Sequence, residues 1–348
     1  MRKVILCFLF VLILSSCRKL FLGEDQPNNP EQNFDLFWND FDKHYALFAI
    51  KGTNWDSLYQ VYRPQVNSTT TDQQLWNILS QLIEHLNDSH TAIYTENYGR
   101  YYESGFELGR KAIDEEFSLN LIRSKFVENF TKTPGEADLS YGKLRNRNIG
   151  YIFLREEEGE NPERAIGEII GKLKNMDAII FDIRTNSGGD ARYSKIIAGS
   201  FSDGEHLIAT VQTRNGPNHT DFNQKVNEVT QKTGAVQYVK PVVLLTDRAT
   251  MSGGEYLTLH LKSFKHVTHI GDTTAGDFSA TSMRRFLPNG WVYRFSIQLF
   301  LLPDGISLDG KGIAPDIYIK NRKDDIAEGN DRVLERAIQY LAEEKGIK

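Results

Sequence analysis

The stretch from residue 148 to residue 191 decides the fold. It contains NIGYIFL (148–154), PERAIGEIIGKLKN (162–175) and DAIIFDIR (177–184), and it ends in TNSGGDA (185–191). The first and third segments are short apolar runs typical of buried strands, whereas the second has the apolar spacing of an amphipathic helix. Strands that alternate with helices indicate parallel strands joined by crossover helices. The sequence therefore predicts an α/β fold.

The same alternation continues toward the C-terminus, and a different pattern precedes it. KPVVLLTD (240–247) predicts a further strand, and DRVLERAIQYLAEEK (331–345) predicts a closing helix. From residue 34 to residue 87, apolar and aromatic side chains recur every three or four positions, which predicts helices whose aromatic stripe forms a core face. Residues 95–145 are weakly patterned. We therefore expect a helical N-terminal domain, a connecting segment and an α/β domain.

The composition excludes several classes of protein. The chain has 348 residues, of which 40% are hydrophobic and 25% charged, so it can bury one large core or two modest ones. A net charge of −5 lacks the basic excess of a nucleic-acid-binding protein, and we expect no nucleic-acid partner. Beyond the N-terminal region, no run of about 18 apolar residues predicts a membrane span.

The N-terminus has the features of a targeting signal. Arg2 and Lys3 precede an apolar run (4–14) that is too short to span a bilayer. The run ends in LSSC (14–17), which resembles a bacterial lipoprotein signal in which Cys17 is lipidated. An ordinary secretory signal with an incidental cysteine is the alternative. The lipoprotein reading predicts a membrane anchor and a location in the bacterial cell envelope.

The cysteine count agrees with that reading. The only cysteines are Cys7, inside the apolar run, and Cys17. A chain processed at Cys17 has no free thiol, which excludes disulfides, cysteine catalysis and thiolate metal sites. The polar residues 18–33 then form a tether.

The sequence ATMSGGEYL (249–257) follows an apolar strand and opens a predicted helix. Ser252 in this turn is either the N-cap of the helix or a nucleophile presented at the strand-to-helix junction. Gly253 and Gly254 leave room for a substrate, and a helix N-terminus supplies free backbone N–H groups. The turn does not match the G-x-S-x-G elbow of α/β-hydrolases. The local sequence therefore leaves both readings open.

Three other stretches carry candidate chemistry. LNDSHTAIY (86–94) places His90 at a helix end, where it is either a base or merely solvated. The glycine-rich turn TNSGG (185–189) is either an oxyanion hole or a simple tight turn, and it lacks the lysine of a phosphate loop. LPDGISLDGKGIAPDI (302–317) lacks the spacing of a calcium loop and supplies acidic residues on turns.

The order of these motifs resembles that of the tricorn-core and carboxy-terminal processing peptidases, a family of serine proteases. The motifs are LNDSHT, NIGYIFL, DIRTNSGG, the Ser252 turn, IGDTTAGD and LDGKGIAPDI. The resemblance implies that Ser252 is the nucleophile and that the Gly253 N–H is one oxyanion donor. Gly188, or its neighbour Gly189, matches the second donor.

The resemblance also bears on the base. Processing peptidases use a lysine, but Asp277 stands at that position here, and an aspartate cannot replace a lysine base. In the tricorn branch the base is a histidine, which His90 matches, with Ser89 beside it as an orienting residue. Asp309 takes the position of the acid that orients the histidine, where the branch more often has Glu. The segment between His90 and residue 148 is too short for the peptide-binding PDZ module that the processing peptidases usually carry there.

The resemblance implies a crotonase-like α/β superhelical catalytic domain with an N-terminal helical domain. It also implies a serine peptidase that cleaves polypeptides through an acyl-enzyme, without a metal or organic cofactor. A non-catalytic ligand- or peptide-binding protein on the same fold and an esterase with the same triad are the alternatives. The predicted segments are the signal (1–17), tether (18–33), helical domain (34–105), connecting segment (106–147), catalytic domain (148–322) and C-terminal helix (323–348).

Overall fold

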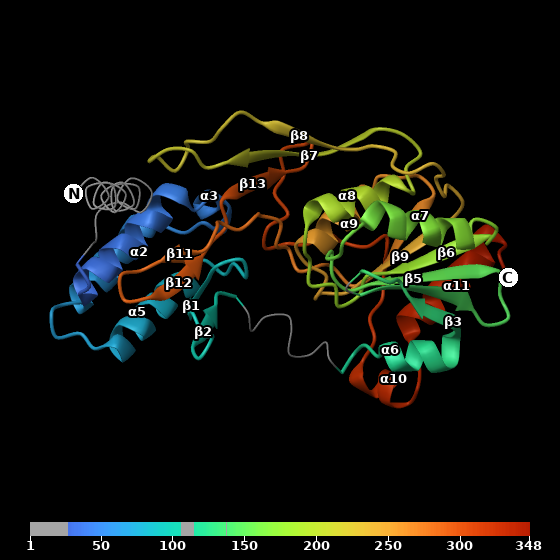
Figure 1. Ribbon diagram of the computed structural model, residues 1–348, viewed down its shortest axis with the longest axis horizontal. Helices are drawn as coiled ribbons and strands as arrows, with labels where there is room; N and C mark the ends of the chain where they lie inside the picture. Colours follow the sequence, from blue (N-terminus) through green and yellow to red (C-terminus); the bar gives the residue numbers. More distant parts are fainter. Residues whose placement is uncertain (1–26, 106–114, 137) are drawn as a thin grey trace, which may run out of the picture.

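The computed structural model describes residues 27–105, 115–136 and 138–348, so Cys17 lies outside the described residues. The described chain forms two lobes (Figure 1). One lobe is largely helical and comes mainly from the first part of the chain. The other is built on a large sheet with helices on both faces. A hairpin of β7 (His206–Thr213) and β8 (Val226–Thr230) runs across the top of the view from one lobe to the other.

The larger lobe contains a seven-stranded sheet in the order β14-β10-β9-β6-β5-β4-β3. Strands β5, β6, β9, β10 and β14 run parallel, and β4 and β3 are antiparallel additions at one edge. This arrangement confirms the predicted α/β fold. The strand bounds are β3 Val127–Lys132, β4 Leu139–Leu144, β5 Ile149–Leu154, β6 Ala178–Asp182, β9 Val242–Thr246, β10 Val267–Gly271 and β14 Ile317–Tyr318.

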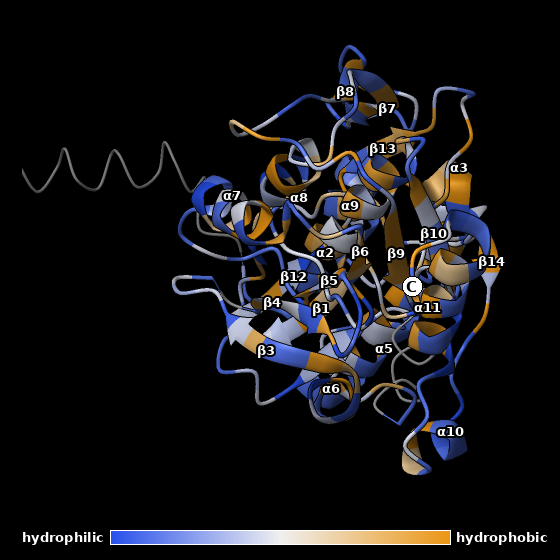
Figure 2. Cartoon of the chain, turned by 90° about the vertical axis from the view of Figure 1, so that its right-hand side faces the viewer, coloured by the Kyte–Doolittle hydropathy of each residue, from blue (hydrophilic) through white to orange (hydrophobic). Residues whose placement is uncertain are grey.

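The central strands are hydrophobic on both faces because helices cover both. Alternate side chains of a strand point to opposite faces. Phe181 and Leu244 pack under three helices on one face, whereas Ile180 and Val243 pack against α11 on the other. Figure 2 shows β9 in hydrophobic colours, while the outer helix α10 is largely hydrophilic. The helices of this lobe are α6 Leu119–Leu121, α7 Pro162–Leu173, α8 Ala191–Gly199, α9 Gly253–Lys262, α10 Lys323–Ala327 and α11 Arg332–Lys345, with the π-helical turn η3 Ile122–Phe126 after α6.

The smaller lobe has an aromatic core. Phe37, Phe41 and Trp55 are buried together, as the aromatic spacing predicts, and they contact Tyr293 and Phe295 from much later in the chain. Its helices are α2 Pro30–His44, α3 Phe48–Lys51, α4 Trp55–Tyr62 and α5 Asp72–Glu84, with the short 3₁₀ turn η1 Arg63–Gln65. The later part of the chain therefore completes the core of the lobe that the first part begins.

Two further sheets complete the fold, one inside the smaller lobe and one between the lobes. The first has the strand order β11-β12-β1-β2, so strands from both ends of the chain pair in it. The second is β13-β7-β8, whose hairpin extends between the lobes. Their bounds are β1 Ala92–Thr95, β2 Tyr101–Glu103, β11 Arg285–Phe286, β12 Trp291–Arg294 and β13 Gln298–Leu301.

A buried ionic network fixes the carboxyl end of β6. The guanidinium of Arg184 donates to both carboxylate oxygens of Asp182 and to both of Asp331, at 2.6–3.0 Å. The Tyr151 hydroxyl also donates to Asp182, at 2.7 Å. A buried charge is tolerated only when it is paired and hydrogen-bonded. Asp331 caps α11, so the network ties the closing helix to the strand that leads into the glycine-rich turn.

Candidate active site

Ser252 lies on a strained turn between β9 and α9. Its backbone has φ 52° and ψ −117°, in a region that residues other than glycine rarely occupy. The side chain makes no cap hydrogen bond with the helix; instead its Oγ lies 3.1 Å from Nε2 of His90. The sequence lacks the G-x-S-x-G motif, yet the backbone forms the same kind of sharp strand-to-helix turn. Ser252 thus stands at the N-cap position of α9 while its hydroxyl is directed at His90, as the nucleophile reading requires.

His90 lies between α5 and β1 and links the two lobes at the site. Its backbone N–H donates to Oδ1 of Asp88 at 3.1 Å, which fixes the start of the strand. Nε2 faces Ser252, and Nδ1 lies 2.6 Å from Oδ1 of Asp277. Burial alone would lower the pKa of His90, but the charge and hydrogen bond of Asp277, with the charge of Asp88, raise it above its ordinary value of 6.5.

The carboxylate at His90 is Asp277 and not Asp309, which corrects the sequence-based expectation. Asp309 accepts from the Phe278 N–H at 3.2 Å and from the Ser307 hydroxyl at 3.4 Å. Among the described residues it has no hydrogen bond or ion pair with His90. The signal for Asp277 was present in the sequence, since this residue occupies the position of the lysine base in processing peptidases.

Ser89 also contacts Asp277. Its hydroxyl donates to Oδ2, while His90 faces Oδ1, so both carboxylate oxygens are engaged. Burial works against ionisation of Asp277, but the charge and hydrogen bond of His90, with the hydrogen bond of Ser89, hold its pKa below its ordinary value. Ser89 therefore lies where the sequence expected it, beside the histidine, although it bonds the acid and not the imidazole.

Glu255 connects the turn of Asp277 to the turn of Ser252. Its fully buried carboxylate accepts from the backbone N–H groups of Gly276 and Asp277, each at 2.7 Å, and from the Thr274 hydroxyl at 2.6 Å. It also accepts from the backbone N–H of Ser252 at 3.3 Å. One side chain in the first turn of α9 thus holds both turns in register. Sequence reasoning noted this glutamate only as part of the serine motif.

The glycine-rich turn meets the serine turn at close range. A Cβ added to Gly188 would lie 2.6 Å from the Cβ of Ser252, so no larger residue fits there. The Gly188 N–H donates to Oδ1 of Asn186 at 2.8 Å and is not free for a ligand. The N–H groups of Gly189 and Gly253 have no acceptor among the described residues, and a Cβ on Gly253 would lie 2.9 Å from N of Gly189. Of the two glycines considered, Gly189 is therefore the one whose N–H has no acceptor among the described residues.

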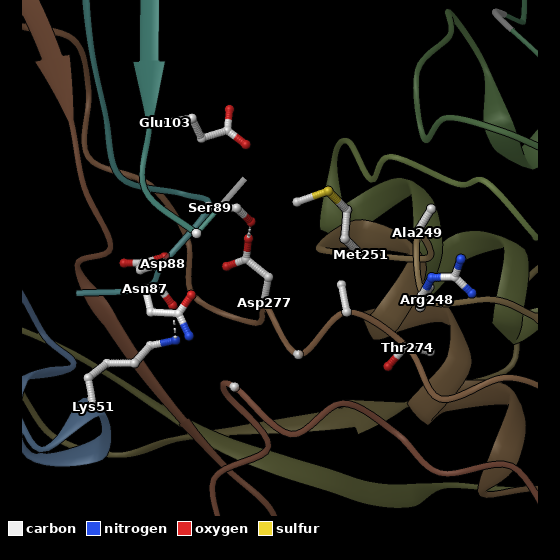
Figure 3. Close-up of a pocket in the computed structure, with 14 residues that line it drawn as sticks. Lys51, Asn87, Asp88, Ser89, Glu103, Arg248, Ala249, Met251, Thr274 and Asp277 are labelled. Carbon is white, nitrogen blue, oxygen red and sulfur yellow. Dashed lines mark hydrogen bonds between the residues drawn. The ribbon is translucent and has the colours of Figure 1, made fainter. Parts of the chain in front are cut away.

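A cavity of about 220 Å³ opens beside this arrangement, between the lobes. Figure 3 shows Ser89 pointing at Asp277 in its centre, with Lys51 on one side and Arg248 on the other. Lys51 donates to the Asn87 carbonyl at 2.9 Å. The residues that line the cavity and are labelled in Figure 3 are Lys51, Asn87, Asp88, Ser89, Glu103, Arg248, Ala249, Met251, Thr274 and Asp277.

Three side chains at the site have the chemistry of metal ligands. Donor atoms of Asp88, His90 and Asp277 lie within 4.8 Å of one another. Both ring nitrogens of His90 are already engaged by Ser252 and Asp277, and Asp88 accepts from the His90 N–H and from a threonine hydroxyl. The donor set is therefore committed to hydrogen bonds within the protein. A serine, an imidazole and a carboxylate in line are the groups needed to activate a hydroxyl nucleophile.

Comparison with known protein families agrees with this chemistry. The model of peptidase family S41 matches residues 148–319, and the model of the tricorn protease C1 domain matches residues 26–84. The carboxy-terminal-processing protease of Bartonella bacilliformis is 23% identical over 229 residues, which are 65% of this chain and 49% of that protein. CtpB of Bacillus subtilis, a carboxy-terminal processing protease, is 27% identical over 183 residues, or 51% and 35%. The chain thus spans about half or less of these relatives.

Solved structures share the fold. The crystal structure of a candidate peptidase from Parabacteroides merdae matches with a TM-score of 0.82 at 26% identity, covering 92% of this chain and 100% of that one. Mature CPAF matches with a TM-score of 0.67 at 11% identity over 90% of this chain. The predicted combination of an α/β catalytic domain and an N-terminal helical region is confirmed. No described helix is long and apolar enough to act as a membrane span.

Proposed function

Because the chain belongs to peptidase family S41, we propose that it is a serine peptidase that hydrolyses peptide bonds through an acyl-enzyme. The observation that carries the proposal is the line of Ser252, His90 and Asp277, with 3.1 Å between the hydroxyl and Nε2 and 2.6 Å between Nδ1 and the carboxylate. A ligand-binding protein needs neither a strained serine nor a paired imidazole. The substrate is a protein or peptide, the class cleaved by the processing proteases that the chain resembles.

The geometry supports the following sequence of steps. Nε2 of His90 takes the proton of Ser252 as Oγ attacks the carbonyl carbon, and Asp277 stabilises the imidazolium that forms. His90 then gives this proton to the leaving nitrogen, the C–N bond breaks, and the acyl group remains on Ser252. A water molecule attacks the acyl-enzyme with His90 again as base, which releases the acid and restores the serine hydroxyl.

The negative charge that develops on the carbonyl oxygen needs fixed donors. The N–H groups of Gly189 and Gly253 lie side by side next to the nucleophile and have no internal acceptor among the described residues. The N-terminus of α9 adds its positive dipole end. Loss of one such donor costs about 3 kcal/mol in related chemistry.

The site of action is proposed to be the bacterial cell envelope. The sequence LSSC (14–17) is the support for this, with Cys17 as the lipidated residue and residues 18–33 as the tether. Firm anchoring follows from several acyl chains on one residue, since each buried methylene contributes about 0.8 kcal/mol. Metabolic labelling with a fatty-acid analogue tests it: wild type should be labelled, and Cys17→Ser should not.

A serine-reactive fluorophosphonate probe tests the peptidase function. Wild type should be labelled and should cleave an unfolded protein, and Ser252→Ala should do neither. His90→Ala should be labelled at least about 100-fold more slowly, because it removes the base. A wild type that is never labelled and cleaves no polypeptide contradicts the proposal and favours a binding protein. Cleavage of esters without cleavage of peptides would indicate an esterase.

A further inference from the structure

A buried acid lies behind the two free N–H groups, and the steps above do not use it. Glu157 follows β5 and is only 1% exposed. Its Oε1 accepts from Nδ2 of Asn186 at 3.0 Å, whereas its Oε2 has no hydrogen-bond partner among the described residues. A buried carboxylate oxygen without a partner is costly, so the group favours its neutral form.

Glu157 is also built into the glycine-rich turn. Its backbone N–H donates to the Gly188 carbonyl at 3.1 Å, and its carbonyl accepts from Asp190 at 2.9 Å. The unpartnered Oε2 points toward the serine turn, because a Cβ added to Gly253 would lie 2.8 Å from it. The same Cβ would lie 2.9 Å from N of Gly189. The carboxyl therefore lies next to both N–H groups that are available for an oxyanion.

No described cation offsets a charge at this position. The acidic neighbours are Glu156 in the same loop and Glu136, which accepts from the Tyr193 hydroxyl; the charge of Glu157 also acts on that hydroxyl. Asp190 and Arg192 also lie nearby, at the surface, where they form an ion pair with each other. Burial is the main cause that raises the pKa of Glu157 to about 8; the charge of Glu156 adds to it, and the hydrogen bond of Asn186 opposes it.

We propose that Glu157 is a positioning residue of the oxyanion hole that works as the neutral acid, and that its ionisation at alkaline pH switches the enzyme off. The inference rests on the proposed peptidase function and adds its regulation. In the neutral form the carboxyl holds the turn that presents Gly189 and places no charge beside the oxyanion. Loss of the proton puts a negative charge next to the site where the oxyanion forms, and two like charges in a dry site repel strongly.

The test compares pH profiles of kcat/KM for wild type, Glu157→Gln and Glu156→Gln in the full chain, from pH 6 to 10. Wild type should give a narrow bell: activity rises as His90 loses its proton, with a pKa of about 9, and falls as Glu157 loses its own, with a pKa of about 8. Glu157→Gln keeps the shape and the hydrogen bond of the neutral acid, so it should stay active and lose the alkaline limb. At pH 9 it should exceed wild type by about tenfold. Glu156→Gln should follow wild type.

Two results overturn the inference. If Glu157→Gln keeps the alkaline limb, the limb belongs to another group, of which buried Glu255 is the first to consider because its pKa is also raised to about 8 by burial. If Glu157→Gln is far less active than wild type at pH 7, the carboxylate and not the neutral acid is required. A structural role alone would lower activity equally at every pH and would leave the limb in place.

Measurements of the unfolding free energy of wild type and Glu157→Gln at several pH values separate this inference from the peptidase function. The folded state holds the Glu157 proton up to about pH 8, whereas the unfolded state loses it near 4.5. Wild type should therefore lose stability relative to Glu157→Gln as the pH rises between these values. A constant difference contradicts the neutral acid without reference to activity. Absence of Ser252-dependent labelling at every pH instead overturns the peptidase function, and the role of Glu157 with it.

Discussion

The turn that carries Asp277 and the turn that carries Asp309 are both buried and rich in glycine, and they pack against each other. Gly310 N–H donates to the Gly276 carbonyl at 2.7 Å, and the carboxylate of Asp309 accepts from the backbone N–H of Phe278. Only Asp277 reaches the imidazole of His90. Asp309 instead bonds the backbone next to Asp277, so its carboxylate supports the turn that presents Asp277 to His90.

The electrostatics of the two aspartates differ in the same way. His90 and Ser89 hold the pKa of Asp277 below its ordinary value, despite burial. Burial, with the charge of Asp88 and a smaller contribution from Asp277, raises the pKa of Asp309 to about 7. The match of a residue to the family's sequence pattern identifies its position in the fold. The hydrogen-bond donors that surround a carboxylate decide whether it is charged and what it can orient.

The largest expected effect separates the two residues by activity. Asp277→Asn removes the charge that stabilises the imidazolium and leaves the wrong hydrogen-bonding partner at Nδ1, so kcat should fall by about 10³–10⁴. Asp309→Asn keeps an acceptor for the Phe278 N–H and should lower kcat by less than about tenfold. Steady-state cleavage of an unfolded protein measures both. Equal losses in the two variants, or a larger loss at Asp309, would return the orienting role to Asp309.

The second effect is on stability, and the two variants should differ in sign. The folded-state pKa of Asp309 lies above that of the unfolded chain, so wild type loses stability between pH 3.8 and about 7 as the unfolded state ionises. When the pH is raised from 4 to 7, the unfolding free energy of Asp309→Asn should therefore rise relative to that of wild type by about 2 kcal/mol.

Asp277 should behave in the opposite way. Its lowered folded-state pKa contributes stability above pH 3.8 that is lost as the pH falls. Asp277→Asn should be less stable than wild type at pH 7, and the deficit should shrink toward pH 3. Urea unfolding of both variants at several pH values decides the matter. A shift of the same sign in both contradicts the assigned charge states.

The smallest effect uses the serine that accompanies each aspartate. The Ser89 hydroxyl donates to Asp277, and the Ser307 hydroxyl donates to Asp309 at 3.4 Å. Ser89→Ala removes a hydrogen bond to the charged acid, worth about 1–2 kcal/mol, and should lower kcat about 5–20-fold and shift the acidic limb of the pH profile. Ser307→Ala, the matched control, should change kcat less than twofold. A normal pH profile in Ser89→Ala would assign Ser89 a packing role only.

Much of the fold followed from local patterns. The strand–helix alternation from residue 148 predicted the parallel strands because each buried strand reads as a continuous apolar run. The aromatic stripe around Phe37 and Phe41 predicted a helical core. The return of residues 285–294 to that core was not predictable, because pairing between strands about 200 residues apart leaves no local periodicity.

The geometry at the site was only partly foreseen. The meeting of Ser252 with His90 followed from the order of the motifs. The acid did not, because Asp277 and Asp309 both occupy positions that the family pattern gives to catalytic groups, and only the fold decides which of them reaches the imidazole. The choice between Gly188 and Gly189 depended on the Asn186 side chain, which binds one N–H and leaves the other free. Glu157 was invisible as a functional residue, since its burial arises only from the contact of two turns.

The network of Arg184 with Asp331 has a consequence for synthesis. The ribosome releases His90 first, then Ser252 and Asp277, and Asp331 only after all of these. Until Asp331 emerges, the guanidinium beneath the glycine-rich turn has one of its two carboxylate partners, and the sheet that presents the serine lacks its closing helix. The sheet that presents Ser252 therefore gains its full set of buried partners only when α11 is available to pack on it.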